Sequence, residues 1–290
     1  MPDKGRVLTE LSLFWFEKLK SIIPNHVVTS RIEEMPDELH KHREKLEGRS
    51  ILVKKAQVIP LEAIVRGYIT GEQQHINAPS ALGYSTCLSF SPGSAWAEYK
   101  KSQTAHGIPL PEGLQESQKL PTPLFTPSTK AEQGAHDENI SPEQGDVPIS
   151  SSFTLNDSIP EIAAALIGRE LYDRVSDIAL KLYTAAADHA ATRGLIIADT
   201  KFEFGLVDNG ELILIDEALT PDSSRYWPLE GYAPGRSQPS FDKQYLRDWL
   251  TSQGFRKGLE GGPEGQGWTM SDEVVQGTRE RYLNARDTLL

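Results

Sequence analysis

Residues 194–216 read GLIIADTKFEFGLVDNGELILID, and this stretch predicts a β-hairpin. Asn209 and Gly210 stand between two apolar runs, which is the strongest short-range signal for a two-residue hairpin turn. Such a turn would place Glu203 directly opposite Asp216 on the neighbouring strand. The apolar side chains that would then face a core are Phe202, Phe204, Leu206, Ile213 and Ile215.

Four charged residues would share the other face of this hairpin: Asp199, Lys201, Glu203 and Asp216. Two carboxylates directly opposite each other have Cβ atoms about 5 Å apart and repel each other. A cation between them would remove that repulsion, and Mg²⁺ held by one or two carboxylates plus phosphates is common in ATP sites. Lys201 could hold an anionic substrate beside the metal. The alternative is a solvated strand face that carries ordinary surface charges.

The composition is that of a chain with a real core. It has 290 residues, of which 38% are apolar, enough for one large or two modest domains. The net charge of −11 argues against nucleic acid as the main partner, because phosphate binding needs a basic face. The single cysteine, Cys87, excludes an intrachain disulfide and favours a cytoplasmic location. No apolar run or signal-peptide pattern predicts a membrane association.

Apolar residues at helical spacing predict four helical segments outside the hairpin. Pro160 suits the first turn of the second segment, and Gly194 suits its end. The segments are 7–23, 157–194, one from Ser240 with Phe241, Tyr245 and Trp249 along one side, and one from Ser271 with Val275, Tyr282 and Leu289 along one side.

Two strands are predicted at 51–55 and 58–69, around a short turn. The stretch 72–93 is rich in Gln, Ser, Pro and Ala, lacks periodicity and reads as an insertion. Residues 107–159 are predicted to form long loops with short strands. The residues that share one face of the second strand are Glu62, Ile64, Arg66 and Tyr68.

Six blocks carry functional residue types in a fixed order. They are VKKAQVIPLEAIVRGYITG at 53–71, SAWAEY at 94–99, LPTPLFTPSTKAEQGAHDENIS at 120–141, GLIIADTKFEFGL at 194–206, LIDEALTPDSSRYW at 214–227 and SFDKQYLRDWL at 240–250. Together they resemble the SAICAR synthetase family (phosphoribosylaminoimidazole-succinocarboxamide synthase), especially its fungal-type branch. The resemblance runs along the whole chain apart from 72–93.

The resemblance implies an α+β, ATP-grasp-related fold of two lobes. Residues 1–62 would be the remainder of a small, β-rich ATP-binding lobe, and 63–290 a larger α+β lobe with the insertion 72–93. The implied enzyme is an ATP-dependent ligase of purine (IMP) biosynthesis that joins L-aspartate to a carboxyaminoimidazole ribonucleotide through an acyl phosphate. ATP and Mg²⁺ are the implied cofactors, and the implied state is a monomer or small homo-oligomer. Cations must offset the crowded anionic charge in such a reaction.

Matching positions imply the residues that bind the nucleotide substrate. Arg66 and Ser94 would contact it, although Arg66 read by itself could be a charge at a strand edge. The residues that would hold its phosphate, ribose or carboxylate end are Lys201, Asp222, Ser223 and Arg225.

The resemblance also implies an ATP site. Glu203 and Asp216 would bind Mg²⁺, in agreement with the hairpin argument. The segment with Lys54, Lys55 and Val58 would take the adenine through its backbone. The loop residues that would serve the ATP phosphates and the aspartate or imidazole side are Lys130, Glu132 and Asp137, with Lys130, Asp137 and Lys201 as catalytic groups. Lys130 read alone could be an ordinary loop charge, and His136 reads better as a hydrogen-bonding loop residue than as a ligand or base.

Two departures from the family pattern leave other functions open. Met1 aligns after the family's N-terminal segment, which covers the ATP phosphates, and 72–93 separates Arg66 from Ser94. A retained intron in the gene would explain 72–93, and a genuine surface insertion is the alternative. The chain could therefore be a catalytically impaired fragment or a non-catalytic nucleotide-binding protein of the same fold. Another ATP-grasp-like enzyme or kinase is the third, weaker interpretation.

Overall fold

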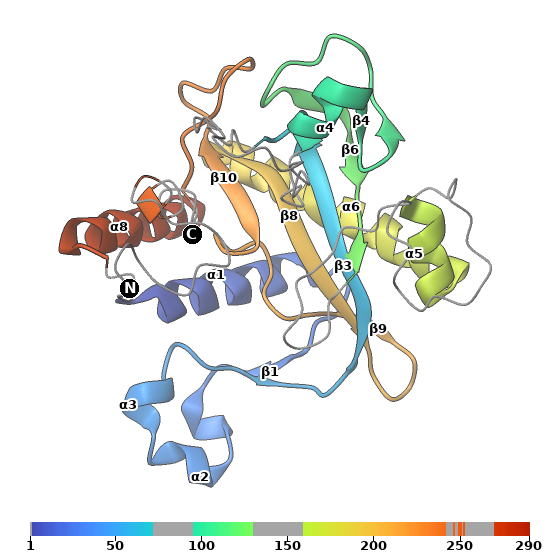
Figure 1. The fold of residues 1–290 in the computed structure, drawn as a ribbon. Helices are drawn as coiled ribbons and strands as arrows, with labels where there is room; N and C mark the ends of the chain where they lie inside the picture. The colour runs from blue at the N-terminus through green and yellow to red at the C-terminus, as the bar shows by residue number, and fades with distance from the viewer. Residues whose placement is uncertain are drawn as a thin grey trace, which may run out of the picture.

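The computed structural model describes residues 2–71, 95–129, 159–241, 246, 249–250, 252 and 270–290. Its centre is an antiparallel sheet with the strand order β10-β8-β3-β6, in which β7 also pairs with β3 and β9 with β8 (Figure 1). The fold is therefore α+β, as the sequence predicts. The strands are β3 (Gln57–Tyr68), β6 (Lys119–Phe125), β7 (Ser128–Thr129), β8 (Leu195–Leu206), β9 (Leu212–Ile215) and β10 (Ser224–Pro228).

Helices cover one face of this sheet and form the main core with it. The longest, α6 (Arg169–Thr192), packs on β8 and β3, and α1 (Lys4–Leu19) lies beside both α6 and α8 (Asp272–Leu289) (Figure 1). The core joins Trp15 of α1 and Leu182 of α6 to the inward side chains of β8, Phe202 and Phe204. These large apolar residues are fully buried, so the helices fix the sheet from one side and leave its other face for polar residues.

The approach of α6 to β3 is so close that it requires a glycine. A Cβ atom placed on Gly67 would lie 1.8 Å from the hydroxyl oxygen of Tyr183. That hydroxyl donates to the backbone carbonyl of Ile197 at 2.7 Å, so α6 is anchored to two neighbouring strands at one point. Gly67 is thus a packing requirement of the sheet.

The predicted helix 157–194 is two helices. Helix α5 (Ile159–Ile167) ends at Gly168, and α6 begins at the next residue. Gly168 has φ 86°, a conformation that interrupts a right-handed helix and that glycine adopts without strain. The predicted single helix was therefore wrong at this residue, while its end at Gly194 is confirmed by the C-terminal bound of α6.

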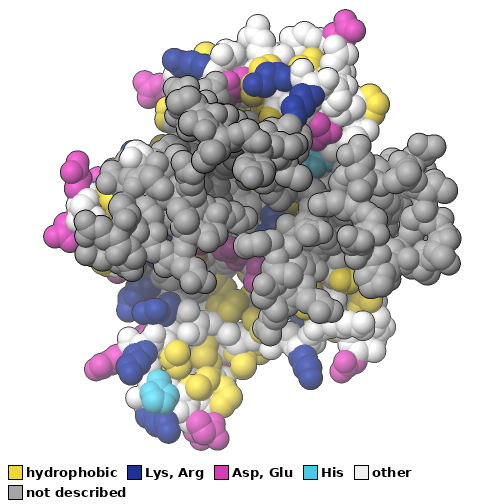
Figure 2. All heavy atoms as spheres, in the orientation of Figure 1, with side chains coloured by type: hydrophobic (Ala, Val, Ile, Leu, Met, Phe, Trp, Pro, Cys, Tyr) yellow, Lys and Arg dark blue, Asp and Glu magenta, His cyan; other side chains and the backbone are white. Residues whose placement is uncertain are grey.

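A small subdomain lies below the sheet in Figure 1. Its strands β1 (Val27–Thr29) and β2 (Leu52–Val53) pair with each other, so β2 does not form a hairpin with β3. Between them lie η1 (Ile32–Glu34), α2 (Asp37–His40) and α3 (Arg43–Leu46), which account for the charged segment 31–49. Apolar side chains gather on its surface in Figure 2, and Val28 and Val53 are exposed there.

A second small subdomain follows β3 at the other end of the sheet. It contains α4 (Ala95–Ser102), β4 (Thr104–Ala105) and β5 (Ile108–Pro109). The amide of Trp96 donates to the carbonyl of Thr70 at 2.9 Å, so α4 starts directly beside the last residues of β3. Its apolar residues form a separate cluster with Ile69.

The hairpin predicted around Asn209 and Gly210 exists, but its register was predicted wrongly. Glu203 pairs with Ile215 instead of Asp216. The turn has three residues instead of two, because the Val207 amide donates to the Glu211 carbonyl and the Gly210 amide to the Val207 carbonyl. Gly210 has φ 79°, as in a hairpin that combines a tight turn with a bulge.

The extra turn residue exchanges the two faces of β9. Leu212 and Leu214 belong to the main core with Phe204. Ile215 instead lies on the polar face, where a Cβ atom on Gly205 would meet its Cδ1 at 3.4 Å. The assignment of Ile213 and Ile215 to the core face was therefore wrong.

The predicted lobe boundary at 62–63 falls inside β3, which continues through it, and the division into lobes stays a prediction. Helix α8 begins at Asp272, with Ser271 as its capping residue, as predicted. Of the predicted helix from Ser240, Phe241 packs against the main core and Tyr245 lies outside the described residues. None of the described helices is both long enough and apolar enough to span a bilayer.

Candidate functional site

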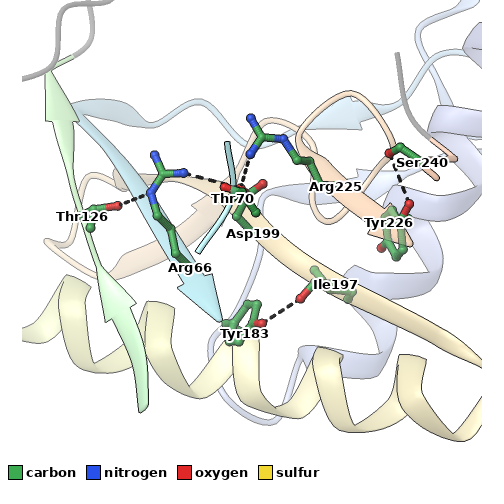
Figure 3. A network of polar contacts seen from close by, with 9 residues as sticks. All are labelled: Arg66, Thr70, Thr126, Tyr183, Ile197, Asp199, Arg225, Tyr226 and Ser240. Carbon is green, nitrogen blue, oxygen red and sulfur yellow. Dashed lines mark hydrogen bonds and ion pairs between the residues drawn. The ribbon is translucent and has the colours of Figure 1, made fainter. Parts of the chain in front are cut away.

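The polar face of the sheet carries a row of charged residues on three adjacent strands (Figure 3). Oδ2 of Asp199 accepts hydrogen bonds from Arg225 at 2.8 Å, from the Thr70 hydroxyl at 2.9 Å and from Arg66 at 3.4 Å. Arg66 also donates through Nε to the Thr126 hydroxyl at 3.1 Å. We call Arg66, Asp199 and Arg225 the arginine row.

Strand pairing produces the arginine row. Arg66 of β3 and Arg225 of β10 are both cross-strand partners of Asp199 in β8. Arg66 is only 4% exposed, and burial lowers its pKa, although the charge of Asp199 works in the opposite direction. The row sets two guanidinium groups around one carboxylate. The row is therefore suited to an anionic ligand with planar oxyanion groups.

A second cluster lies one step further along the same strands. Glu62 of β3 is the direct cross-strand partner of Glu203 in β8. Lys201 donates to Glu62 at 2.5 Å and to Glu203 at 3.4 Å. Burial lowers the pKa of Lys201, but the hydrogen bond and charge of Glu62, together with Glu203, outweigh it and raise the pKa above its ordinary value. This cluster carries one net negative charge.

The predicted pair of facing carboxylates is thus present with a different partner. Glu62, and not Asp216, stands opposite Glu203. Asp216 follows β9 with φ 61° and is exposed, at the rim of a cavity of about 180 Å³. That cavity is lined by Leu8, Thr9, Ser12, Ile51, Asp216 and Glu217. In the described part of the chain, no group of three or more His, Cys, Asp or Glu side chains is arranged for a metal ion.

The loop between β9 and β10 joins the two clusters. The carbonyl of Ser223 accepts from the Lys201 amide at 2.9 Å, which ties the loop to β8. The carboxylate of Asp222 points to the helical layer, where it accepts from Tyr282 of α8 at 2.6 Å and pairs with Lys4 of α1 at 2.7 Å. The structure therefore brings Ser223 to the Lys201 cluster and connects Asp222 to two helices.

The predicted adenine segment precedes β3. Lys54 and Lys55 are exposed, and the Lys54 amide donates to the His26 carbonyl at 2.7 Å, which binds this segment to the small subdomain. Val58 is 44% exposed and pairs with Gly205 of β8. The role of this segment in adenine binding stays a prediction. The Lys54 amide already donates a hydrogen bond within the protein.

Four predicted site residues lie outside the described residues: Ser94, Lys130, Glu132 and Asp137. The insertion 72–93 lies outside them as well. The site residues that the sequence reasoning did not select are Glu62, Asp199 and Thr70. Periodicity placed Glu62 on the same strand face as Arg66, and Asp199 on the same face as Lys201. The sequence did not show that β3 pairs with β8, and this pairing is what brings the two sets of residues together.

Comparisons with known proteins agree on one family. The family described as SAICAR synthetase matches residues 1–261. The phosphoribosylaminoimidazole-succinocarboxamide synthase of Maridesulfovibrio salexigens is 48% identical over 283 residues, covering 98% of this chain and 79% of that protein. The protein of the same name from Pichia angusta is 48% identical over 293 residues, covering 99% and 81%.

Solved structures give the same result. The SAICAR synthase of Saccharomyces cerevisiae, solved in complex with SAICAR, is 42% identical, with a TM-score of 0.76 over 100% of this chain and 82% of that one. A SAICAR synthetase solved with ADP is 21% identical, with a TM-score of 0.59 over 100% of this chain and 82% of that one, and supports the fold alone.

Proposed function

The chain belongs to the SAICAR synthetase family and has the function of a phosphoribosylaminoimidazole-succinocarboxamide synthase in de novo purine biosynthesis, and we propose that the polar face of its central sheet is where the reaction takes place. The γ-phosphoryl group of ATP is transferred to the carboxylate of 5-amino-1-(5-phosphoribosyl)imidazole-4-carboxylate, which converts a carboxylate oxygen into a leaving group. The amine of L-aspartate then attacks the acyl phosphate, the amide forms, and phosphate leaves.

The arginine row carries this proposal. It presents two guanidinium groups, held by one carboxylate, and such groups bind phosphate and carboxylate oxygens in a bidentate manner. We assign the anionic groups of the nucleotide substrate to Arg66 and Arg225. The binding of SAICAR by the Saccharomyces cerevisiae relative, at 42% identity, supports this assignment. Ser94, Asp222 and Ser223 complete the proposed nucleotide site on the strength of the family resemblance.

The carboxylate cluster next to the row fits Mg²⁺ and ATP. Mg²⁺ in ATP sites uses one or two protein carboxylates, and Glu62 and Glu203 offer two facing carboxylates there. We assign the ion to Glu203, with Asp216 added on the family resemblance alone, and when bound it would neutralise charge on the phosphates. Lys201, held protonated by its two carboxylate neighbours, would place a fixed positive charge beside the transferred group.

The remaining assignments rest on the family resemblance. Lys130, Glu132 and Asp137 would serve the ATP phosphates and the aspartate or imidazole side. The segment with Lys54, Lys55 and Val58 would take the adenine of ATP. A cytoplasmic location and a monomeric or small homo-oligomeric state belong to the same proposal.

ADP release tests the proposed reaction. The assay contains ATP, Mg²⁺, L-aspartate and the carboxyaminoimidazole nucleotide, and each is omitted in turn. A form without 72–93 is measured beside the whole chain. Release that requires both co-substrates and the metal supports the ligase reaction. ADP release from ATP alone, or nucleotide binding without any turnover in either form, contradicts it. Activity only in the shortened form would show that 72–93 blocks the site.

A further inference from the structure

His106 lies in the turn between β4 and β5, and its side chain is buried. Ala105 pairs with Ile108, so His106 and Gly107 are the two central residues of a tight turn. Both have positive φ, 52° and 74°, as in a turn that glycine and asparagine form with least strain. Gly107 is exposed, as expected at a turn, but His106 is only 6% exposed. The turn therefore directs an imidazole into the protein.

Glu98 of α4 holds this turn in place. Its carboxylate accepts from the amides of His106 at 2.7 Å and Gly107 at 2.9 Å, and from the Thr104 hydroxyl at 2.7 Å. Three hydrogen bonds to one carboxylate fix the backbone on both sides of His106. The direction of the imidazole is thus set by α4, which starts beside Thr70 of the candidate site.

One ring nitrogen of the buried imidazole lacks a hydrogen bond to any described residue. In the described part of the chain, Nε2 of His106 has no hydrogen-bond partner. A buried polar atom without a partner costs about 1–3 kcal/mol, so such an atom calls for an explanation. Burial, together with the nearby positive charge of Arg66, lowers the pKa of His106 to about 4, while Glu98 works in the opposite direction. The ring is therefore neutral at pH 7, with one N–H to donate.

We propose that His106 is a further substrate-binding residue, whose Nε2 forms a hydrogen bond with an anionic group of the carboxyaminoimidazole nucleotide bound at Arg66. The inference rests on the proposed function of the arginine row. It explains the three features of His106 together: the strained turn position, the clamp by Glu98 and the unused Nε2 of a ring that is influenced by the charge of Arg66. Ligand binding would supply the hydrogen bond that the folded protein leaves unmade.

Substitutions within the same turn test this proposal. His106→Asn keeps a residue that tolerates positive φ, but its amide does not reach the position of Nε2. His106→Gln restores that reach. Gly107→Asn is the matched control, because an added Cβ there would meet no atom within 4 Å. Thermal unfolding of each variant shows that the turn still folds, and KM is then measured for each substrate.

We expect His106→Asn to raise KM for the nucleotide about tenfold or more, the loss typical of a hydrogen bond to a charged group, with KM for ATP and aspartate within twofold. His106→Gln should recover most of the loss, and Gly107→Asn should match the unchanged protein. A nucleotide KM within twofold in His106→Asn, an equal rise in all three KM values, or no recovery in His106→Gln overturns the proposal.

The two proposals can fail separately. If the unchanged protein is an active ligase and His106→Asn binds the nucleotide as well as it does, only the role of His106 is wrong. If there is no turnover, calorimetric titration of the nucleotide decides: binding that His106→Asn weakens tenfold supports His106, and equal binding or none overturns it. The absence of turnover in the unchanged protein contradicts the proposed reaction, whatever the binding result for His106→Asn.

Discussion

Asp199 determines the geometry of the arginine row, because one of its oxygens accepts hydrogen bonds from Arg66, Thr70 and Arg225. Removing its charge would leave two neighbouring guanidinium groups without the carboxylate between them. Burial makes that repulsion expensive, since Asp199 is 9% exposed and Arg66 is 4% exposed. The arginine row therefore depends on this carboxylate for the arrangement of its two guanidinium groups.

We expect Asp199→Asn to lower the free energy of unfolding by about 3 kcal/mol, the usual effect of breaking a buried charge pair. Urea denaturation measures this change. Asp173→Asn in α6 is the control, because Asp173 pairs with Arg169 on an exposed surface, where such a pair contributes about 0–1 kcal/mol. Equal losses in the two variants would contradict a special role for the arginine row.

His106 makes stability depend on pH in a predictable direction. Burial and Arg66 lower its folded pKa to about 4, against 6.5 for an ordinary histidine. Between these two values the unfolded chain binds more protons at this residue than the folded protein, so stability rises with pH across that window and falls on acidification. The loss should reach about 3 kcal/mol by pH 4.

Comparison with His106→Asn isolates this contribution from those of the carboxylates. Urea denaturation from pH 7 to pH 4.5 should show a steeper decline in the unchanged protein than in the variant, because only the former has the imidazole to protonate. Parallel curves would mean that His106 titrates normally in the folded state.

At the scale of elements, the hairpin of β8 and β9 shows what a sequence pattern determines and what it leaves open. Asn209-Gly210 predicted the position of the turn correctly but not its length, and a turn one residue longer shifts the pairing of Glu203 from Asp216 to Ile215. Sequence alone does not choose between turns of two and three residues, since Gly210 suits a positive φ in both. The face of every residue in β9 depends on that choice.

Local sequence patterns likewise did not predict which distant strands pair with each other. Periodicity placed Glu62 and Arg66 on one face of β3, yet nothing local indicated that β8 would lie beside them and bring Glu203 and Asp199 opposite. The family resemblance selected Arg66, Lys201 and Arg225, which lie on the paired strands β3, β8 and β10. Neither strand periodicity nor the family resemblance selected His106, because a turn residue is expected at the surface.

Gly210 tests the observed turn. Gly210→Ala should lower the free energy of unfolding by about 1–2 kcal/mol, because alanine is strained at φ 79° although space is available. Gly210→Asn should lose less. Gly5→Ala in α1 is a control of opposite sign, since alanine in a helix is favoured by about 0.5–1 kcal/mol and its Cβ would meet Arg49 only at 3.6 Å. Urea denaturation that shows no loss for Gly210→Ala would argue against the bulged turn.

At the scale of the whole molecule, the first and last helices, α1 and α8, meet at the loop between β9 and β10. Helix α1 supplies Lys4 and helix α8 supplies Tyr282, and both bind the carboxylate of Asp222, which belongs to the loop between β9 and β10. Tyr282 is 1% exposed and lies in the main core, so the hydroxyl bond connects packed helices to a loop that also holds Lys201 through Ser223. The packing of α1 and α8 can thereby position the loop between β9 and β10 and, through Ser223, the backbone of Lys201.

Tyr282→Phe removes only the hydroxyl and keeps the ring in the core. Because a hydrogen bond to a charged group is worth about 1.5–3 kcal/mol, we expect a loss of that order in urea denaturation, and a severalfold rise in KM for the nucleotide with KM for ATP unchanged. Arg279→Met, which breaks an exposed pair with Asp3 between the same two helices, should change stability by less than about 1 kcal/mol and leave both KM values unaltered.

Combining Tyr282→Phe with Asp222→Asn should lower the free energy of unfolding by less than the sum of the two single changes, since both remove the same bond. Additive losses would show that α8 stabilises the fold without positioning the loop between β9 and β10.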